Sequence, residues 1–370
     1  MDKQWYEIEN TAHFASPGLV FYPDRILVNV KRLKNSIDDV NRLRPHVKTH
    51  KSSELTLLML QAGIHKFKCA TIAEAEMLGN CRAPDVLLAY QLVGPNIERF
   101  IKLMQTFPLT HFSCLIDNEQ SLNELSTAAL NAGVIVSVYL DLNVGMNRTG
   151  IIPGENAVHL YKAMKAARDI RVVGLHIYDG HIHDASYEKR SAQFSIIWES
   201  IVDFKEQLLL HGFDRPVIIA GGTPTFPFYA EKEEVECSPG TFILWDKGYQ
   251  DAFTEQNYLT SALIISRVIS LPGDDLVSLD LGHKAVAAEN ELKKRITFLN
   301  APEAIVVSQS EEHLVLKLQS DHGYKIGDLF YGLPQHICPT VALYDHAAVV
   351  YDHECKEEWK ITARNRMITI

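Results

Sequence analysis

The chain has 370 residues, of which 46% are hydrophobic and 22% are charged, and its formal net charge is −10. This length accommodates one large domain and a smaller one. An acidic chain without a basic cluster is not expected to bind nucleic acid or an anionic membrane surface.

The amino terminus and the cysteines indicate the compartment. No apolar signal core occurs in the opening residues MDKQWYEIEN, and no apolar run is long enough to span a bilayer. The six cysteines are scattered along the chain and lack the dense spacing of a disulfide framework. We therefore expect a cytoplasmic protein with reduced thiols.

Up to about residue 245, apolar strand-like runs alternate with amphipathic helical segments. Strands are predicted at 46–48, 66–70, 86–90, 111–116, 134–142, 172–178, 217–220 and 235–238. Helices are predicted at 53–62, 72–78, 119–132 and 191–210, with Asn118 capping the third. Eight apolar strands alternating with helices predict an α/β fold, a (β/α)8 TIM barrel over residues 17–245.

From residue 246 to residue 370 the pattern changes. The segments TSALIISRVISL, EAIVVSQS, HLVLKLQ and WKITARNRMITI are short, rich in β-branched residues and separated by Gly, Asp and Pro turns. They predict a C-terminal all-β domain. Residues 1–16 are expected to return to this domain.

The first predicted strand lies in the segment RPHVKTHK. If residues 45–49 are extended, His46, Lys48 and His50 share one face. Neighbouring positive charge and partial burial would then lower the pKa of Lys48 and free its amine for chemistry. The alternative is a solvated basic edge.

Other chemically useful side chains follow later strands, at the end of a barrel where active sites lie. The fifth strand, in VYLDLNVGMNRTGI, delivers Arg148 in a loop flanked by glycines. The sixth, in GLHIYDGHIHD, delivers His176, Tyr178, His181 and His183. Each alone could be a solvated arginine, a surface histidine or a core histidine, but their common position favours a functional site.

After the seventh strand, PVIIA runs directly into GGTPTF. Gly221 and Gly222 allow backbone N–H groups to converge on an anion, and Thr223 and Thr225 offer hydroxyl donors. The loops after strands seven and eight commonly hold a phosphate in such barrels. Pro224 removes one possible donor, and a tight turn with capping threonines is the alternative.

In the β domain, PQHICPT places His336 and Cys338 two residues apart, hence on one side of a predicted strand. Imidazole and thiolate are zinc-type ligands, but two ligands leave a site open. The alternative is a small buried cysteine with no metal.

Seven segments, taken together and in order, resemble the D-threonine aldolase/D-serine dehydratase group of pyridoxal-phosphate enzymes, which have the alanine-racemase-like fold (type III). The segments are RPHVKTHK, ATIAEAEML, DVLLAYQLVGP, DLNVGMNRTGI, YDGH, GGTPTF and HICPTVALYD. The resemblance runs from about residue 17 to residue 351. It implies a barrel plus a β domain, a homodimer and a small D-amino acid as substrate.

The resemblance also implies the roles of individual residues. Lys48 would form a Schiff base with pyridoxal 5'-phosphate, Arg148 would hydrogen-bond the phenolic oxygen of this cofactor, and Tyr178 would line its ring. The residues implied to hold the phosphate are Gly221, Gly222 and Thr223, and those implied to bind a divalent metal, zinc or manganese, are His336 and Cys338.

Two features of the resemblance favour different reactions. A cysteine at the second metal position is more similar to the dehydratases. The YDGHIHD loop is more similar to the aldolases, with His181 or His183 as a base for the β-hydroxyl. We expect a metal-dependent lyase that cleaves D-3-hydroxy amino acids by a retro-aldol reaction into glycine and an aldehyde.

Three alternatives stay open: a D-serine dehydratase-like ammonia-lyase, an amino-acid racemase and a non-catalytic protein that binds pyridoxal phosphate. A racemase needs no metal at the substrate's side chain. A non-catalytic carrier needs neither the long β domain nor the His-x-Cys pair.

Overall fold

The computed structural model of the chain describes residues 3–366 and 369–370. The chain folds into two compact units. The barrel unit comprises Leu33–Lys48, Leu55–Gly240 and the described residues from Asn365 onward, and the β unit comprises the described residues up to Arg32, Thr49–Glu54 and Thr241–Arg364. No helix in the described part of the chain combines the length and apolar character that a bilayer crossing requires.

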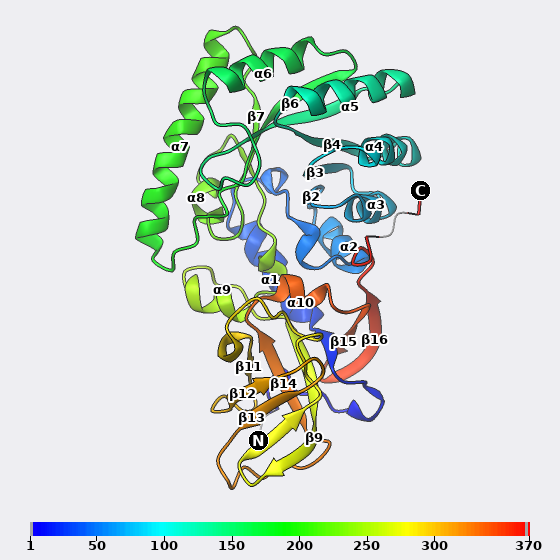
Figure 1. Ribbon diagram of the computed structural model, residues 1–370, viewed down its shortest axis with the longest axis vertical. Coiled ribbons are helices and arrows are strands. Elements are labelled where there is room, and N and C mark those ends of the chain that lie inside the picture. Colours follow the sequence, from blue (N-terminus) through cyan, green and yellow to red (C-terminus); the bar gives the residue numbers. More distant parts are fainter. Residues whose placement is uncertain (1–2, 367–368) are drawn as a thin grey trace. The chain divides into compact units, whose positions relative to one another are not determined.

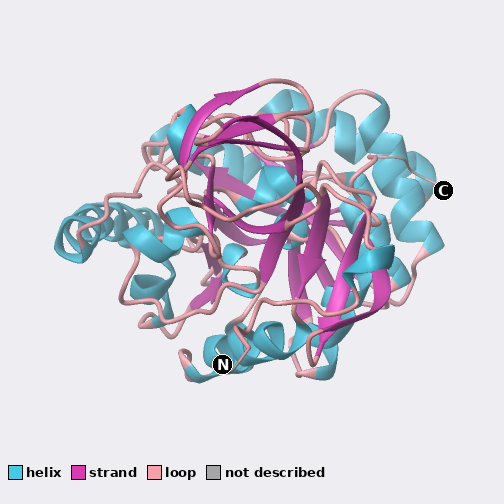
Figure 2. Ribbon diagram, turned by 90° about the horizontal axis from the view of Figure 1, so that it is seen from below, coloured by secondary structure: helices cyan, strands magenta, loops and turns pink. Residues whose placement is uncertain are grey.

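Seven parallel strands form the sheet of the barrel unit, and they follow one another in chain order (Figure 1). These are β2 (Lys66–Cys69), β3 (Asp85–Gln91), β4 (His111–Ile116), β5 (Val136–Leu142), β6 (Ile170–Ile177), β7 (Val217–Ala220) and β8 (Val235–Cys237). The helices are α2 (Ser53–Gln61), α3 (Ile72–Asn80), α4 (Pro95–Thr106), α5 (Glu119–Ala132), α6 (Glu155–Ala166), α7 (Tyr187–Leu210) and α8 (Phe226–Ala230). The helices lie around the outside of the strands (Figure 2), as in a (β/α)8 barrel.

The short segment LRPH fills the eighth position of the ring. Single parallel bridges join its Leu43 to Cys237 of β8 and its His46 to Lys68 of β2. The backbone N–H of Lys68 also donates to the carbonyl of Pro45 at 2.9 Å. The predicted barrel is therefore confirmed, but its first strand is reduced to two isolated bridges.

The chain does not continue as a strand beyond this segment. Val47–Thr49 form the 3-10 helix η3, so the prediction that His46, Lys48 and His50 share one face of an extended strand is wrong. The Nδ1 atom of His46 accepts a hydrogen bond from the backbone N–H of Lys48 at 3.2 Å. Such a local bond from side chain to backbone competes with strand pairing and stabilises the turn.

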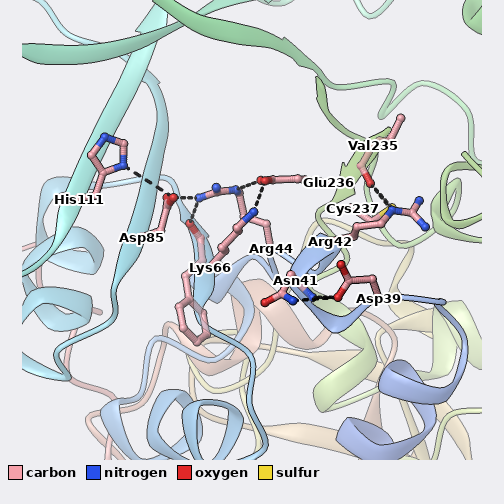
Figure 3. A network of polar contacts seen from close by, with 11 residues as sticks. Asp39, Asn41, Arg42, Arg44, Lys66, Asp85, His111, Val235, Glu236 and Cys237 are labelled. Carbon is pink, nitrogen blue, oxygen red and sulfur yellow. Dashed lines mark hydrogen bonds and ion pairs between the residues drawn. The ribbon is translucent and has the colours of Figure 1, made fainter. Parts of the chain in front are cut away.

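A buried ion network ties the closing segment to strands on both of its sides (Figure 3). Arg44, whose side chain is 1% exposed, donates to Asp85 at 2.6 Å and to Glu236 at 2.8 Å. Lys66 pairs with the second oxygen of Glu236, and His111 lies 3.7 Å from Asp85. Burial alone would raise the pKa of Asp85, but the contacts with His111 and Arg44 outweigh it and hold this pKa well below its usual range.

An apolar layer follows the ion network inside the barrel. Its buried members are Leu87, Leu115, Tyr139 and Ile219. They come from β3, β4, β5 and β7, which are not all neighbours, so their side chains meet in the interior of the ring. Since alternate residues of a strand share a face, β3 directs Asp85, Leu87 and Gln91 inward in turn.

Local signals determine the helix ends as expected. Helix α5 begins after Asn118, whose side chain accepts a hydrogen bond from the backbone N–H of Ser121 at 2.9 Å. It ends at Gly133, which has a left-handed φ of +63°. The prediction that Asn118 caps this helix is confirmed.

The β unit contains a nine-stranded, mainly antiparallel sheet. Its strands are β1 (Gly18–Phe21), β9 (Ala262–Gly273), β10 (Leu276–Leu279), β11 (Ile296–Phe298), β12 (Ile305–Gln309), β13 (Leu314–Lys317), β14 (Leu329–Pro334), β15 (His346–Tyr351) and β16 (Glu354–Lys360). Strand β1 pairs in parallel with β15 and antiparallel with β9. The unit also contains α1 (Pro23–Asn35) over most of its length, α9 (Lys247–Ala252) and α10 (Ile337–Val341).

One predicted strand of the β unit is largely absent. In the segment WKITARNRMITI, only the first two residues belong to β16, and turns follow up to residue 365. Met367 and Ile368 lie outside the described residues. The core of the β unit combines residues from the N-terminal and C-terminal parts of the chain. Tyr6 and Val20 pack in one cluster with Leu263, Tyr331 and Ala348.

Replacing Arg44 by methionine should lower the free energy of unfolding by about 3–5 kcal/mol, because it leaves the carboxylates of Asp85 and Glu236 buried without their shared cation. Urea unfolding followed by circular dichroism measures this change. The matched control is Arg215→Met. It removes an arginine that is 65% exposed and pairs with Glu234, and it should cost at most about 1 kcal/mol. Equal losses for the two variants would contradict a closing role for Arg44.

Candidate active site

A cavity of about 620 Å³ lies at the carboxyl ends of the barrel strands. It is lined by His46, Lys48, Lys68, Ala70, Ala89, Tyr90, Gln91, Val93, Asp117, Arg148, Thr149, His176 and Tyr178. The lining residues come from the closing segment, from η3, and from the ends of several strands and the loops that follow them. A cavity of this size accommodates a small cofactor or substrate.

Three cations surround the ring of Tyr178 in this cavity. The Nζ atoms of Lys48 and Lys68 each lie 5.5 Å from the ring centroid, and the guanidinium carbon of Arg148 lies 4.9 Å from it. The predicted residues Lys48, Arg148 and Tyr178 are therefore brought together. An aromatic face with three cations around it suits a planar, anionic ligand.

His176 is held in a defined state beside the three cations. Its Nδ1 lies 2.7 Å from Asp141 Oδ1, and the second oxygen of Asp141 accepts a hydrogen bond from Gln91 at 2.7 Å. Burial, together with the nearby Lys68, lowers the pKa of His176 to about 4. The ring is thus neutral near pH 7, with its proton on Nδ1 facing the carboxylate. Its Nε2 is buried without a hydrogen-bond partner.

Lys68 is the main residue of this cavity for which the sequence patterns give no prediction. It lies on the inner face of β2 and is 3% exposed. Burial and the neighbouring Lys48 lower its pKa to about 7. The signal in the sequence is the alternation KFK in a predicted barrel strand, which puts a second lysine inside the ring two residues after Lys66. Gln91 and Asp117 carry a similar signal, since each stands at the end of a predicted strand.

The glycine loop after β7 lies against Tyr178. Gly221 has a φ of +76°, and a Cβ there would lie 2.7 Å from the Tyr229 ring, so only glycine fits. A Cβ on Gly222 would lie 3.2 Å from Tyr178 Cε2. The loop therefore approaches two aromatic rings closely, Tyr229 at Gly221 and Tyr178 at Gly222, because it carries no side chain at these positions.

The two threonines of the same loop make different contacts. The hydroxyl of Thr223 accepts a hydrogen bond from the N–H of Gly240 at 3.2 Å, which ties the loops after β7 and β8 together. The hydroxyl of Thr225 donates to the buried Asp179 at 2.9 Å. Burial raises the pKa of Asp179 above its usual range.

His181 and His183 lie in the loop after β6, where both are exposed. Neither is among the residues that line the cavity. The ring of His181 lies 3.0 Å from the position of a Cβ on Gly145, within the loop that also carries Arg148. The structure thus puts His181 beside the arginine loop, and it brings neither histidine to the cavity wall.

In the β unit, His336 and Cys338 do not lie on a strand, and the prediction that they share one side of a strand is wrong. Strand β14 ends at Pro334, His336 is the N-cap of α10, and Cys338 lies in the first turn of this helix. Pro339 follows within the same turn. Proline is tolerated there because the first N–H groups of a helix have no partner within the helix.

The two side chains nevertheless lie close enough to shift each other's pKa. Burial would raise the pKa of the Cys338 thiol, but His336 outweighs this effect and lowers it. Burial opposes the charged form of His336, whereas Cys338 and Asp246 raise its pKa to about 9. Glu289 accepts from the Nδ1 of His336 at 2.7 Å.

Imidazole and thiolate donors of this kind fit a zinc-type ion, with Glu289 orienting His336. Among the described residues, no group of three or more His, Cys, Asp or Glu side chains is arranged to hold a metal ion. The protein thus offers two donors, and the remaining positions of a metal would be open to water or substrate.

The fold is that of the alanine-racemase type of barrel. The family model "Alanine racemase, N-terminal domain" matches residues 22–246, and "Putative serine dehydratase domain" matches residues 261–350. The chain belongs to the alanine racemase N-terminal domain family, with a serine dehydratase-type domain after the barrel. The resemblance found in the sequence motifs is confirmed.

Two similar curated proteins are aldolases. A D-threonine aldolase of Arthrobacter sp is 25% identical, with 87% of this chain and 85% of the relative covered. A 3-hydroxy-D-aspartate aldolase of Paracoccus denitrificans is also 25% identical, with 95% and 92% covered. A D-serine dehydratase of Saccharomyces cerevisiae is 22% identical, with 88% of each chain covered.

Among solved structures, the D-threonine aldolase of Filomicrobium marinum superposes with a TM-score of 0.88 at 23% identity, with 96% of each chain covered. This similarity extends over both units of the fold. The structure and the family together make the chain a barrel enzyme whose curated relatives are mainly lyases of D-3-hydroxy amino acids.

Proposed function

We propose that the protein is a pyridoxal-phosphate-dependent lyase that cleaves D-3-hydroxy amino acids between Cα and Cβ into glycine and an aldehyde. The observation that carries this proposal is the cavity in which Lys48, Arg148 and Tyr178 converge at the carboxyl end of the barrel. The two aldolase relatives that cover most of the chain support the reaction type.

The residues of the cavity fit a phosphorylated pyridine ring. Lys48 would carry the Schiff base, Arg148 would donate hydrogen bonds to the phenolic oxygen, and Tyr178 would lie along the ring. Gly221, Gly222 and Thr223 would hold the phosphate, and the closeness of Gly222 to Tyr178 supports this assignment. When bound, pyridoxal phosphate supplies an electron sink for negative charge at the substrate's Cα.

The remaining polar residues would position the substrate and move its protons. We assign His181 or His183 as the base for the β-hydroxyl proton, because their loop directly follows Tyr178 in the chain. His336 and Cys338 would hold a divalent ion, zinc or manganese, which supplies a Lewis acid for a hydroxyl oxygen. The neutral Nε2 of His176 offers a fixed acceptor in the cavity.

A D-serine-type dehydratase is the second candidate. Cys338 favours it, since the cysteine at this metal position resembles the dehydratases, and a dehydratase is also among the relatives. In that case the hydroxyl leaves after Lys48 removes the Cα proton. The two reactions share the cavity and differ in which bond breaks.

Replacing Lys48 by alanine should abolish the adduct trapped by borohydride on the purified holoenzyme, because the Schiff base nitrogen is lost. Peptide mass spectrometry locates the adduct. Lys68→Ala is the matched control, since it removes the other lysine of the same cavity and should leave the adduct on residue 48. An adduct that persists in Lys48→Ala would refute the assignment.

Incubation with D-threonine and with D-serine separates the two reactions. We expect glycine and acetaldehyde from D-threonine, as a retro-aldol cleavage requires. A 2-oxo acid and ammonia as the main products would instead establish the dehydratase. Chromatography of the amino acids and an enzymatic aldehyde assay read out both results.

The metal proposal predicts that Cys338→Ala lowers the metal content of the purified protein at least about tenfold, because one of two protein donors is lost. Atomic emission measures this directly, independently of activity. Cys355→Ala, which changes another partly exposed cysteine of the β unit, should leave the metal content unchanged. Full turnover after removal of the metal by a chelator would contradict a catalytic role for the ion.

A further inference from the structure

Lys68 is a cation of the cavity to which the proposed function assigns no role. The imine, the phenolic oxygen and the phosphate of the cofactor are accounted for by Lys48, Arg148 and the glycine loop. Lys68 lines the same cavity, with its Nζ 5.5 Å from the Tyr178 ring. This Nζ is buried and has no hydrogen-bond partner.

The carboxylates of Asp141 and Asp179, which act electrostatically on Lys68, each accept a hydrogen bond from another residue. Asp141 has one oxygen 2.7 Å from His176 Nδ1, and its other oxygen accepts from Gln91 at 2.7 Å. One oxygen of Asp179 accepts from the hydroxyl of Thr225 at 2.9 Å, and its other oxygen is buried without a hydrogen-bond partner. Both carboxylates act on Lys68 through space and raise its pKa, but neither forms an ion pair with it.

An amine in this position destabilises the folded protein. Removing a charged group from water without a partner is unfavourable, and the amine responds by a lowered pKa. Methionine would fill the same volume without this penalty. A buried polar group that is retained at such a cost in a cavity marks a ligand-binding position.

The ligand that suits Lys68 is an anion of the substrate. Amino acid substrates carry an α-carboxylate, and the 3-hydroxy dicarboxylic ones carry a second carboxylate on the side chain. None of the residues assigned above binds a carboxylate of the substrate. A buried ammonium group forms strong charge-assisted hydrogen bonds with such a group.

We propose that Lys68 anchors a carboxylate of the bound amino acid substrate. The inference rests on the proposed function for the identity of the substrate. Lys68 is then a residue that touches the substrate. Its amine lies at the inner wall of the cavity, and the carboxylate of the ligand neutralises its charge.

The groups that face Lys68 determine how the anchor depends on pH. They are His46 from the closing segment, Lys48 from η3, Asp141 from β5, Arg148 and Thr149 from the loop after β5, His176 and Tyr178 at the end of β6, and Asp179 beyond it. The pKa of Lys68 is lowered to about 7, so its ammonium group loses its proton above this pH when no substrate is bound. A carboxylate binds the charged form, and its affinity should therefore fall as the pH rises above about 7.

The test compares holoenzymes of the wild type, Lys68→Met and Lys68→Arg on D-threonine and on 3-hydroxy-D-aspartate. Lys68→Met should raise KM on the order of 10- to 100-fold, the range expected for losing a hydrogen bond to a charged group, with kcat changed only a few-fold. Cofactor content should be unchanged, and the melting temperature should be unchanged or higher. Lys68→Arg should restore much of the affinity and abolish the fall in affinity above about pH 7.

The two substrates identify which carboxylate is bound. An equal rise in KM for both means that Lys68 binds the α-carboxylate, and a rise for 3-hydroxy-D-aspartate alone means that it binds the side-chain carboxylate. Unchanged KM values for both overturn the proposal. The control is Lys66→Met on the same face of β2. Lys66 pairs with Glu236, and in this variant Glu236 still has Arg44 as an ion-pair partner. This variant should leave KM unchanged.

Failure of the proposed function gives a different result. A holoenzyme that cleaves neither substrate refutes the lyase proposal and leaves Lys68 to be tested by binding alone. Titrations with D-alanine and with D-aspartate, followed through the absorbance of the cofactor, then measure the affinity for an α-carboxylate and for a side-chain carboxylate. Weaker binding of either amino acid by Lys68→Met supports the anchor, and equal binding of both overturns it.

Discussion

The ion pairs of Arg44 are the interaction on which the barrel unit depends. The segment that closes the ring contributes only two backbone bridges, far fewer than a full strand. Arg44 compensates by holding Glu236 of β8 and Asp85 of β3 from one buried guanidinium group (Figure 3). Lys48 stands four residues further along the chain. The ion pairs of Arg44 therefore also fix the backbone position from which the side chain of the proposed Schiff base lysine extends.

The interior of the barrel separates its charges by depth. The ion network is neutralised within itself, and on β3 the apolar Leu87 separates Asp85 of the network from Gln91 of the cavity. The carboxylates of the network therefore do little to compensate the cations of the cavity. The burial of Lys68 strengthens the mutual repulsion of Lys48 and Lys68, and this repulsion contributes to the lowered pKa of Lys68.

The cavity keeps several polar groups in states that a purely structural core would avoid. Lys68 Nζ and His176 Nε2 are both buried without a hydrogen-bond partner, while Asp141 is fully engaged by its neighbours. Unsatisfied groups of this kind reduce stability, and they are found where a ligand supplies the missing hydrogen-bond partner. The β unit shows a related arrangement, in which His336 and Cys338 stabilise each other's charged forms.

The sequence by itself determined the features that depend on neighbours along the chain. The strands at His111–Ile116 and Val217–Ala220 and the helix at Glu119–Ala132 agree with the predicted ranges, because apolar periodicity and a capping side chain act locally. The motifs likewise identified the family, and with it the proposed roles of Lys48, Arg148 and Tyr178. Only the tertiary structure decided which groups lose their partners. The 3-10 turn at Lys48, the helical turn at Cys338 and the unpaired amine of Lys68 each result from contacts, made or missing, with the surrounding fold, and hydrophobic pattern does not encode such contacts.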